Sequence, residues 1–488
     1  PCKPALLALL MSAGLAALWP AQPAQADTCA INWNTDSSGN FNVAGNWDQN
    51  RVPTGADKAC INRPVGNPEV TIPAGYTATL AALTNRDGLL RIDGALVITG
   101  SDSILANLTV IDRCSGLLQV DAGGGLALEG DAADVTWSNY CPTATLVVNG
   151  ALNKTGGGIS TFAATSIYVQ GGTLSATEGT LGMGNGSLVS ATLNAGISGT
   201  VSIAGYVPMS GTLTGSGAGS VEFSSGNLVA TGTQAILNFP DGLFRWTGGY
   251  LDARHAPITN TGFIRHTGFS ILCGDLRNSG TLNVESVLNL DAQTANLTNL
   301  PSGTVNLRGD AYTNLASTCY DAWPASQGVG ILRNYGTLNK TDGGNSRIIN
   351  VQVKTMGASV HVVSGTLSLA NQPHLFENAN IMIDAGASIN ADGAGGGAWS
   401  VLEMSGTVTG TGAGQFVLGQ PLRAVGEGAR LNFAPGWLTM APNGAQFDGY
   451  TAPITYLNQI DLPFNTNVSV CGAFDNLGVI NIRGIWNQ

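Results

Sequence analysis

The stretch Gly280-Thr-Leu-Asn-Val284 returns one step along the chain as Gly303-Thr-Val-Asn-Leu307, and this pattern decides the fold. In both copies a glycine makes a turn, and alternate residues then place Leu or Val on one side and Asn on the other. An interval of about 20–25 residues between such turns corresponds to one coil of a β-solenoid. Gly-Thr-Leu or Gly-Thr-Val begins at Gly172, Gly199, Gly211, Gly280, Gly303, Gly336, Gly365 and Gly406. The pattern therefore predicts an all-β chain folded as a right-handed parallel β-helix (β-solenoid) of roughly 15–20 coils.

Composition excludes several classes of protein. The 488 residues are 43% hydrophobic and only 10% charged, so the chain can form a core and is unlike a disordered protein. The formal net charge is −11, and the 20 Lys and Arg form no cluster. Phosphate backbones and anionic lipid surfaces are bound by clustered cations, so we expect no nucleic-acid partner.

The segment 1–26 has the features of a signal peptide. Lys3 precedes an apolar run from Ala5 to Trp19, and Ala24-Gln-Ala26 is a small-residue cleavage site that would leave Asp27 as the new terminus. A membrane anchor is the alternative, but the run is short for a full span and no other apolar run approaches that length. The sequence thus predicts an exported protein with no membrane span. Because it begins with Pro rather than Met, we also expect a piece of a longer chain, which could include a C-terminal anchor.

Seven cysteines follow the signal peptide, and an oxidising compartment favours disulfides. The alternative is a metal site, which would use Cys-x-x-Cys or clustered His and Cys spacing. The chain has neither, so we expect no metal and no cofactor. Sequence-local couples predict three bridges and one free thiol: Cys29 with Cys60, Cys114 with Cys141, Cys273 with Cys319, and Cys471 alone.

A longer repeat overlies the short one, and the offset between its copies is nearly constant. Its matched motifs include Leu152-Asn-Lys-Thr155 with 338–341, Leu237-Asn-Phe239 with 431–433, and Ala256-Pro-Ile-Thr259 with 452–455. The duplication predicts a first β-helix block over 67–270 and a second over 271–470. The closing segment, 471–488, aligns without gaps with 273–290, so we expect it to be the start of a third, truncated block.

Asn-x-Gly recurs at Asn260, Asn278, Asn334 and Asn476. Like positions stack between coils of a solenoid, so these amides could form a hydrogen-bonded ladder along the axis. Alternatively, Asn and Gly recur only because both favour turns. The sequence leaves both interpretations open.

Residues 27–66 differ from the repeats and predict an N-terminal cap. They contain Gly45-Asn-Trp47, Val52-Pro53 and Asp57-x-Ala59-x-Ile61. This order resembles the segment that opens the passenger regions of large exported bacterial β-helix proteins, which are autotransporter-like or adhesin-like. The resemblance is clearest within this segment and implies an exported repeat architecture. A Trp-rich cap joined by Cys29 and Cys60 would cover the open end of the solenoid.

The densest ionisable cluster in this weakly charged chain is a candidate binding face. It comprises Asp241, Arg245, Asp252, Arg254, His255, Arg265 and His266. Residues one coil apart could stack, with Asp241 near Arg265 or Arg245 near His266. The matching stretch of the second copy, 431–461, has Asp448 and Asp461 but no Arg or His. The cluster is therefore not part of the repeat, which fits either a special role or a solvated surface with salt bridges.

We expect a structural or adhesive protein, secreted or on the outer cell surface of a bacterium, whose partners are surface glycans or proteins of a host or neighbouring cell. The alternative is a polysaccharide-degrading or carbohydrate-binding β-helix protein. Of four motifs typical of polygalacturonase-like enzymes the chain has only Asn34-Thr-Asp36, within the predicted cap. We therefore predict no enzymatic activity and no catalytic residues. A row of exposed Trp and Tyr would indicate carbohydrate binding.

Overall fold

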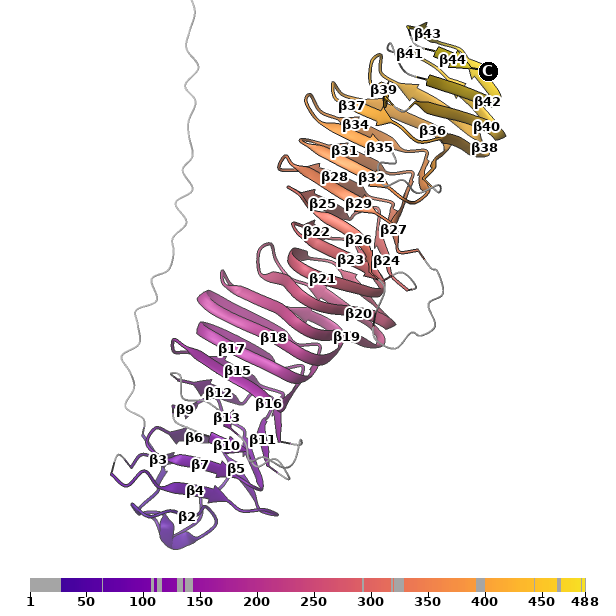
Figure 1. Cartoon of the computed structure of the whole chain (residues 1–488). Coiled ribbons are helices and arrows are strands. Elements are labelled where there is room, and N and C mark those ends of the chain that lie inside the picture. The colour runs from indigo at the N-terminus through magenta and orange to yellow at the C-terminus, as the bar shows by residue number, and fades with distance from the viewer. Residues whose placement is uncertain are drawn as a thin grey trace, which may run out of the picture.

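The computed structural model describes most of the chain after residue 27 and shows a β-solenoid of about 18 turns. Strands of successive coils pair in parallel, which confirms the predicted all-β solenoid. Figure 1 shows an elongated rod with the first and last coils at opposite ends. The described residues are 28–63, 65–106, 109–111, 116–129, 135–136, 144–291, 294–316, 319, 329–391, 400–442, 444–462, 467–483 and 485–487.

Two predictions fall outside these residues: the signal peptide at 1–26 and the Cys114–Cys141 bridge. Within them, the one helical element is a single 3-10 turn, η1 (Ala44–Asn46). None of the described helices has the length and apolar character that crossing a membrane would require.

In the central coils each turn of the solenoid contributes one strand to each of three faces, which we call A, B and C. Face A contains β24 (Asn296–Asn299), β27 (Ile331–Asn334) and β30 (Gln352–Met356). Face B contains β25 (Thr304–Arg308), β28 (Thr337–Thr341) and β31 (Ser359–Val362). Face C contains β26 (Tyr312–Ala316), β29 (Asn345–Ile349) and β32 (Thr366–Ala370). Each of these strands pairs in parallel with its neighbours on the same face.

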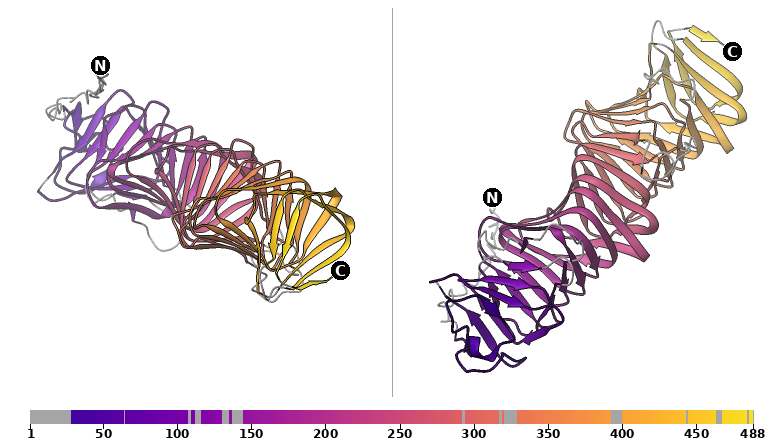
Figure 2. Two further views of the ribbon diagram at one scale, coloured as in Figure 1. Left: turned by 90° about the horizontal axis from the view of Figure 1, so that it is seen from above. Right: turned by 60° about the horizontal axis from the view of Figure 1, so that its bottom comes forward.

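Nearer the N-terminus, one long strand bends at the corners of a coil and contributes to more than one face. Both β20 (Phe244–Asn260) and β21 (Phe263–Asn278) pass from face B through face C to face A. Register shifts between the two strands, after Trp246 and again after Ala253, mark the corners at which they bend. Figure 2 shows the stacked coils from two further sides.

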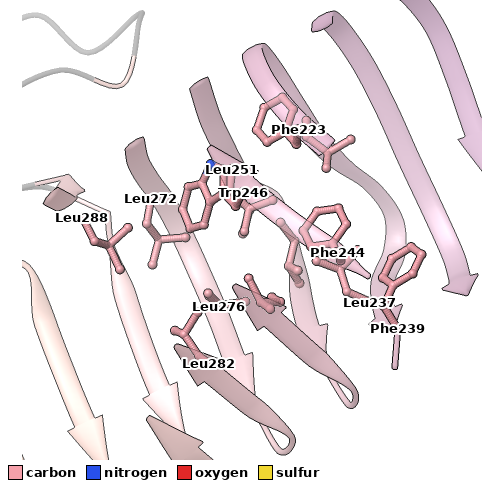
Figure 3. Packing of buried hydrophobic residues seen from close by; sticks show 14 of the residues in the cluster. Phe223, Leu237, Phe239, Phe244, Trp246, Leu251, Leu272, Leu276, Leu282 and Leu288 are labelled. Carbon is pink, nitrogen blue, oxygen red and sulfur yellow. The ribbon is translucent and has the colours of Figure 1, made fainter. Parts of the chain in front are cut away.

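The core lies inside the stack, where equivalent apolar side chains of successive coils contact one another. In β22 (Thr281–Val284) Leu282 is fully buried, and its register partners are Ile264 in the coil before and Val305 in the coil after. Figure 3 shows such residues pointing inward from neighbouring strands, with Phe244 and Trp246 among them. Burying each such side chain contributes about 1.5–3 kcal/mol, so the repeated Leu and Val positions fix the coil register.

A ladder of asparagines runs through the interior of face A. Asn260 Nδ2 donates to Asn278 Oδ1 at 2.7 Å, Asn278 to Asn299 at 2.8 Å, and Asn299 to Asn334 at 2.8 Å. All four side chains are buried, and each amide also donates to a backbone carbonyl at a neighbouring turn. The ladder interpretation is therefore confirmed for Asn260, Asn278 and Asn334, with Asn299 as an additional member.

For Asn476, which lies many coils away, the alternative interpretation as a turn residue fits. Its side chain is exposed, and among the described residues it hydrogen-bonds to Gly478 of its own turn. A local Asn-x-Gly pattern cannot distinguish a buried rung from an isolated turn, because both need the same backbone conformation.

The N-terminal segment, for which a cap was predicted, buries aromatic side chains beside the first coils. Trp33, Phe41 and Trp47 are buried, and the Trp47 ring lies edge-on to both others, with centroids 5.2 Å from Trp33 and 4.9 Å from Phe41. Arg51 binds both carboxylate oxygens of Asp57, at 2.7 and 2.8 Å, and its hydrogen bonds hold the pKa of Asp57 below its usual range. The motif residues of the exported-protein resemblance thus build the end of the solenoid.

Two of the three expected cysteine pairs lie within the described residues and are bonded. Cys29 and Cys60 have a Cα–Cα distance of 5.7 Å, and Cys273 and Cys319 one of 6.0 Å. Cys471 carries a free thiol in this structure and is partly exposed. The first bridge ties the start of the cap to β3 (Lys58–Ile61), and the second ties residue 319 to the outer side of β21.

The matched motifs of the long repeat lie on different faces. Leu237-Asn-Phe239 begins within β19 (Ser220–Asn238), whose partners lead through β20 and β21 to β24 of face A. Its counterpart, 431–433, ends β38 (Leu422–Phe433), whose partners lead back through β36 (Leu402–Thr411) and β34 (Asn380–Ile383) to β31 of face B.

A second pair of matched residues shows the same displacement. Asp252 is the register partner of Cys273, and this strand row continues through β23 (Val287–Asp291) to β26 of face C. Asp448 is the partner of Arg423, and its row leads back through β36 and β33 (His374–Glu377) to β30 of face A. One repeat therefore spans a number of whole coils plus about one third of a coil.

Candidate binding surface

The structure separates the seven residues of the candidate binding face into three groups. Arg245 and Arg265 lie on the outer side of face B, and His266 points into the core behind them. Asp252, Arg254 and His255 lie at the end of the face C segment of β20, and Asp241 is exposed in the turn before β20. The expected stacks do not form, because Arg245 pairs with Arg265 and Trp246 with His266. A register difference of one residue places Arg245 and His266 on opposite sides of the sheet.

The two arginines belong to an ion-pair ladder on face B. Arg265 and Arg308 both contact Glu285, at 2.9 and 2.8 Å, and Arg308 also contacts Asp342 at 2.5 Å. Arg245 lies 3.7 Å from Glu222 in the preceding coil. The arginines of this row are therefore paired with carboxylates of the same or neighbouring coils.

His266 is held in the core and is neutral at physiological pH. Its ring lies edge-on to Trp246 at 5.2 Å, and neither ring nitrogen has a hydrogen-bond partner among the described residues. Burial lowers the pKa of His266 to about 4, although the Glu285 carboxylate opposes this. A buried neutral imidazole cannot serve a ligand on the outer surface.

Asp252 is an outward-facing carboxylate that is nevertheless only 3% exposed. Arg254 covers it, with Nε 2.9 Å from one carboxylate oxygen and Nη2 2.7 Å from the other. Burial would raise the pKa of Asp252, but the hydrogen bonds from Arg254 outweigh it and lower the pKa. The Cys273–Cys319 bridge lies beside this pair, and the same small hollow is also bordered by Asn227 and Tyr250.

The same surface of face C carries aromatic side chains that the sequence interpretation did not select. Tyr168, Tyr206 and Phe269 are 37%, 54% and 65% exposed, and Tyr250 is partly exposed beside the disulfide. Their inward neighbours, such as Ile167, are buried, so the alternation within each strand places the rings outside. The missed signal was an aromatic residue at the outward position of a coil.

The second copy contains a similar buried carboxylate. Asp448 is 9% exposed and accepts a hydrogen bond from Arg423 Nε at 3.0 Å. The matched stretch 431–461 contains no arginine, but the partner of Asp448 precedes that stretch and comes from the previous coil. Cys471 is the register partner of Asp448, as Cys273 is of Asp252.

Other parts of the described surface offer less chemistry. A hollow of about 520 Å³ lies over glycine turns near Gly124 and Gly150, and the described residues that line it include no ionisable or aromatic side chain. The described residues contain no group of three or more His, Cys, Asp or Glu able to hold a metal ion. The surface around Tyr206, Asn227, Tyr250 and Asp252 is therefore the candidate site.

Comparison with protein-family models, with curated proteins and with solved structures gave no match.

Proposed function

We propose that this chain is an exported structural or adhesive protein, secreted or displayed on the outer surface of a bacterial cell. The observation that carries the proposal is the solenoid of about 18 turns. At about 4.8 Å per coil the rod is roughly 85 Å long, which gives reach and a broad surface for contact. The two disulfides are compatible with an oxidising compartment.

Binding is a better interpretation of the outer surface than catalysis. Glycoside hydrolysis uses two facing carboxylates, one of which must exchange a proton or attack the substrate. On the candidate surface Asp252 is instead buried and bonded by both nitrogens of Arg254. The outward tyrosines favour the second candidate function, carbohydrate binding, which is compatible with a surface adhesin.

Localisation and attachment test the proposal directly. Intact cells that produce the chain should lose it to an added protease, while a cytoplasmic marker protein is spared. A deletion strain should attach less to its native surface, and attachment should return when the gene is restored. A chain that remains protected until the cells are lysed would contradict the proposal.

A further inference from the structure

We propose that the outer side of face C binds an extended neutral β-1,4-linked glycan, with Tyr206 and Tyr250 as stacking platforms. The inference deepens the proposed function, on which it rests, by naming the class of ligand and the residues that contact it.

Tyr206 and Tyr250 lie on alternate coils and in one register column. Tyr168 lies on the same face but two residues to one side of that column, because its partner Ser187 directly precedes the Leu188–Met209 pair and so faces Pro208. Tyr206 pairs with Asn227, which pairs in turn with Tyr250. Because successive parallel strands are about 4.8 Å apart, these two rings are about 9.6 Å apart along the axis.

This spacing matches a two-fold sugar ribbon. In an extended β-1,4-linked glycan each sugar is turned over relative to the last, so every second sugar presents the same ring face. The axial C–H groups of that face pack against the face of an aromatic ring, and Tyr adds a hydroxyl that can hydrogen-bond at the edge. A chain lying along the solenoid axis would therefore meet one tyrosine for each disaccharide.

The coil between the two tyrosines provides a low, polar floor. Its outward residue in their column is Asn227, which is shorter than the rings on either side. The Asn227 amide and the Tyr206 hydroxyl make no hydrogen bond with any described residue. Both remain available for sugar hydroxyls, and a few such polar groups among apolar walls are typical of small-ligand sites.

Charge favours a neutral ligand over an acidic one. On this surface Asp252 is neutralised by Arg254, and the tyrosines and Asn227 are uncharged. The chain as a whole has a net charge of −11, which repels a uronate polymer. The surface therefore lacks the unpaired cations that an acidic polysaccharide would need.

Isothermal titration of the purified chain with cellohexaose and with chitohexaose tests the proposal. The unmodified chain should bind at least one of them, and Tyr206→Ala should weaken binding roughly three- to tenfold. Tyr206→Phe should stay within about twofold, because the ring is kept. Tyr450→Ala is the matched control, since Tyr450 is 77% exposed but lies far along the rod, and it should leave binding unchanged.

Three outcomes would overturn the inference: no binding of either hexasaccharide, unchanged binding in a Tyr206→Ala/Tyr250→Ala double variant, or binding of hexagalacturonate alone. Circular dichroism and the thermal midpoint of each variant establish that it is folded. If cells display the chain and attach while these titrations fail, the inference is wrong and the proposed function stands. If the chain is not exported, the proposed function fails whatever the titrations show.

Discussion

The two buried aspartates, Asp252 and Asp448, occupy matched positions of the repeat yet obtain their arginine from different places. Arg254 reaches Asp252 from two residues along the same strand, whereas Arg423 reaches Asp448 from the coil before. The residue that matches Arg423 in the first copy is Val229, the register partner of Asp252. Both copies thus contain a nearly buried carboxylate paired with an arginine, but the arginine occupies a different position in each copy.

The cysteines beside the two aspartates differ as well. Cys273 is bonded to Cys319, and this bridge packs with Ile271 and Tyr250 over the outer side of face C. Cys471 is free, and its sulfur accepts a hydrogen bond from Gln446 at 3.1 Å. An aspartate beside a cysteine of the next coil therefore occurs in two settings. In the first copy a disulfide covers the surface, and in the second copy the cysteine is free.

Replacing the cysteines should give the largest difference between the copies. Cys273→Ser should destabilise its region by about 4 kcal/mol, because the bridge closes a 46-residue loop. Cys471→Ser should cost no more than about 0.5 kcal/mol, since it removes only a partly exposed thiol. Native-state hydrogen exchange in β21 and in β40 (Ala445–Tyr456) would measure both effects. Equal losses in the two strands would show that the bridge contributes nothing beyond its packing.

The second-largest difference between the copies should be the loss of stability at low pH, and it should come from His266. The matched residue in the second copy is Leu462. The folded pKa of His266 is about 4, below the ordinary value of 6.5, so the unfolded chain binds the proton more readily. The contribution of neutral His266 to the free energy of unfolding is complete above pH 6.5 and is lost as the pH falls towards 4. Between pH 7 and 4.5 this loss should be about 2 to 3 kcal/mol.

His266→Leu, which copies the second block, should remove that part of the pH dependence. Urea unfolding at pH 7 and at pH 4.5 measures it. His374, also buried with a pKa of about 4, remains in the variant and is the internal control. An unchanged difference between the two pH values would mean that His266 is already solvated in the native state.

The smallest of the three effects concerns the arginines. Arg254→Ala should cost about 2 kcal/mol by leaving the buried Asp252 carboxylate unpaired, and Arg423→Ala about 1 kcal/mol because Asp448 is more exposed. Adding Val229→Arg to Arg254→Ala rebuilds the arrangement of the second copy and should restore about half of the loss. A double variant less stable than Arg254→Ala would show that the two arrangements are not interchangeable.

The fold could be predicted because it repeats short-range rules many times over. Turn glycines and alternating Leu or Val fix the strands, as around Leu282, and a coil of nearly constant length fixes their stacking. The buried lysines were harder to foresee. Lys154 and Lys340 occupy inward positions of the repeated Leu-Asn-Lys-Thr motif, and each amine reaches backbone carbonyls of the following turn. The alternation of residues along a strand shows which side chains point inward. It does not show which backbone carbonyls will accept hydrogen bonds from a buried lysine amine.

The candidate site could be predicted only in part. Asp252, Arg254 and His255 do lie together, whereas Arg245 and His266 fall on opposite sides of one sheet. Such distinctions depend on the register between coils, which shifts by one residue after Trp246 and by three after Ala253, and no residue type predicts these shifts. Tyr206 and Tyr250 share one column, and Tyr168 lies on the same face, only because coils of unequal length bring them there.

The extra third of a coil in each repeat determines the directions in which matched surfaces point. Asp252 on face C and Asp448 on face A look outward along directions about one third of a full rotation apart, since the three faces share that rotation. An array of such repeats would behave like the thread of a screw, in which only every third repeat returns to the same bearing. A rod of this kind, anchored in any rotational orientation, would keep some copy of each surface turned towards a neighbour.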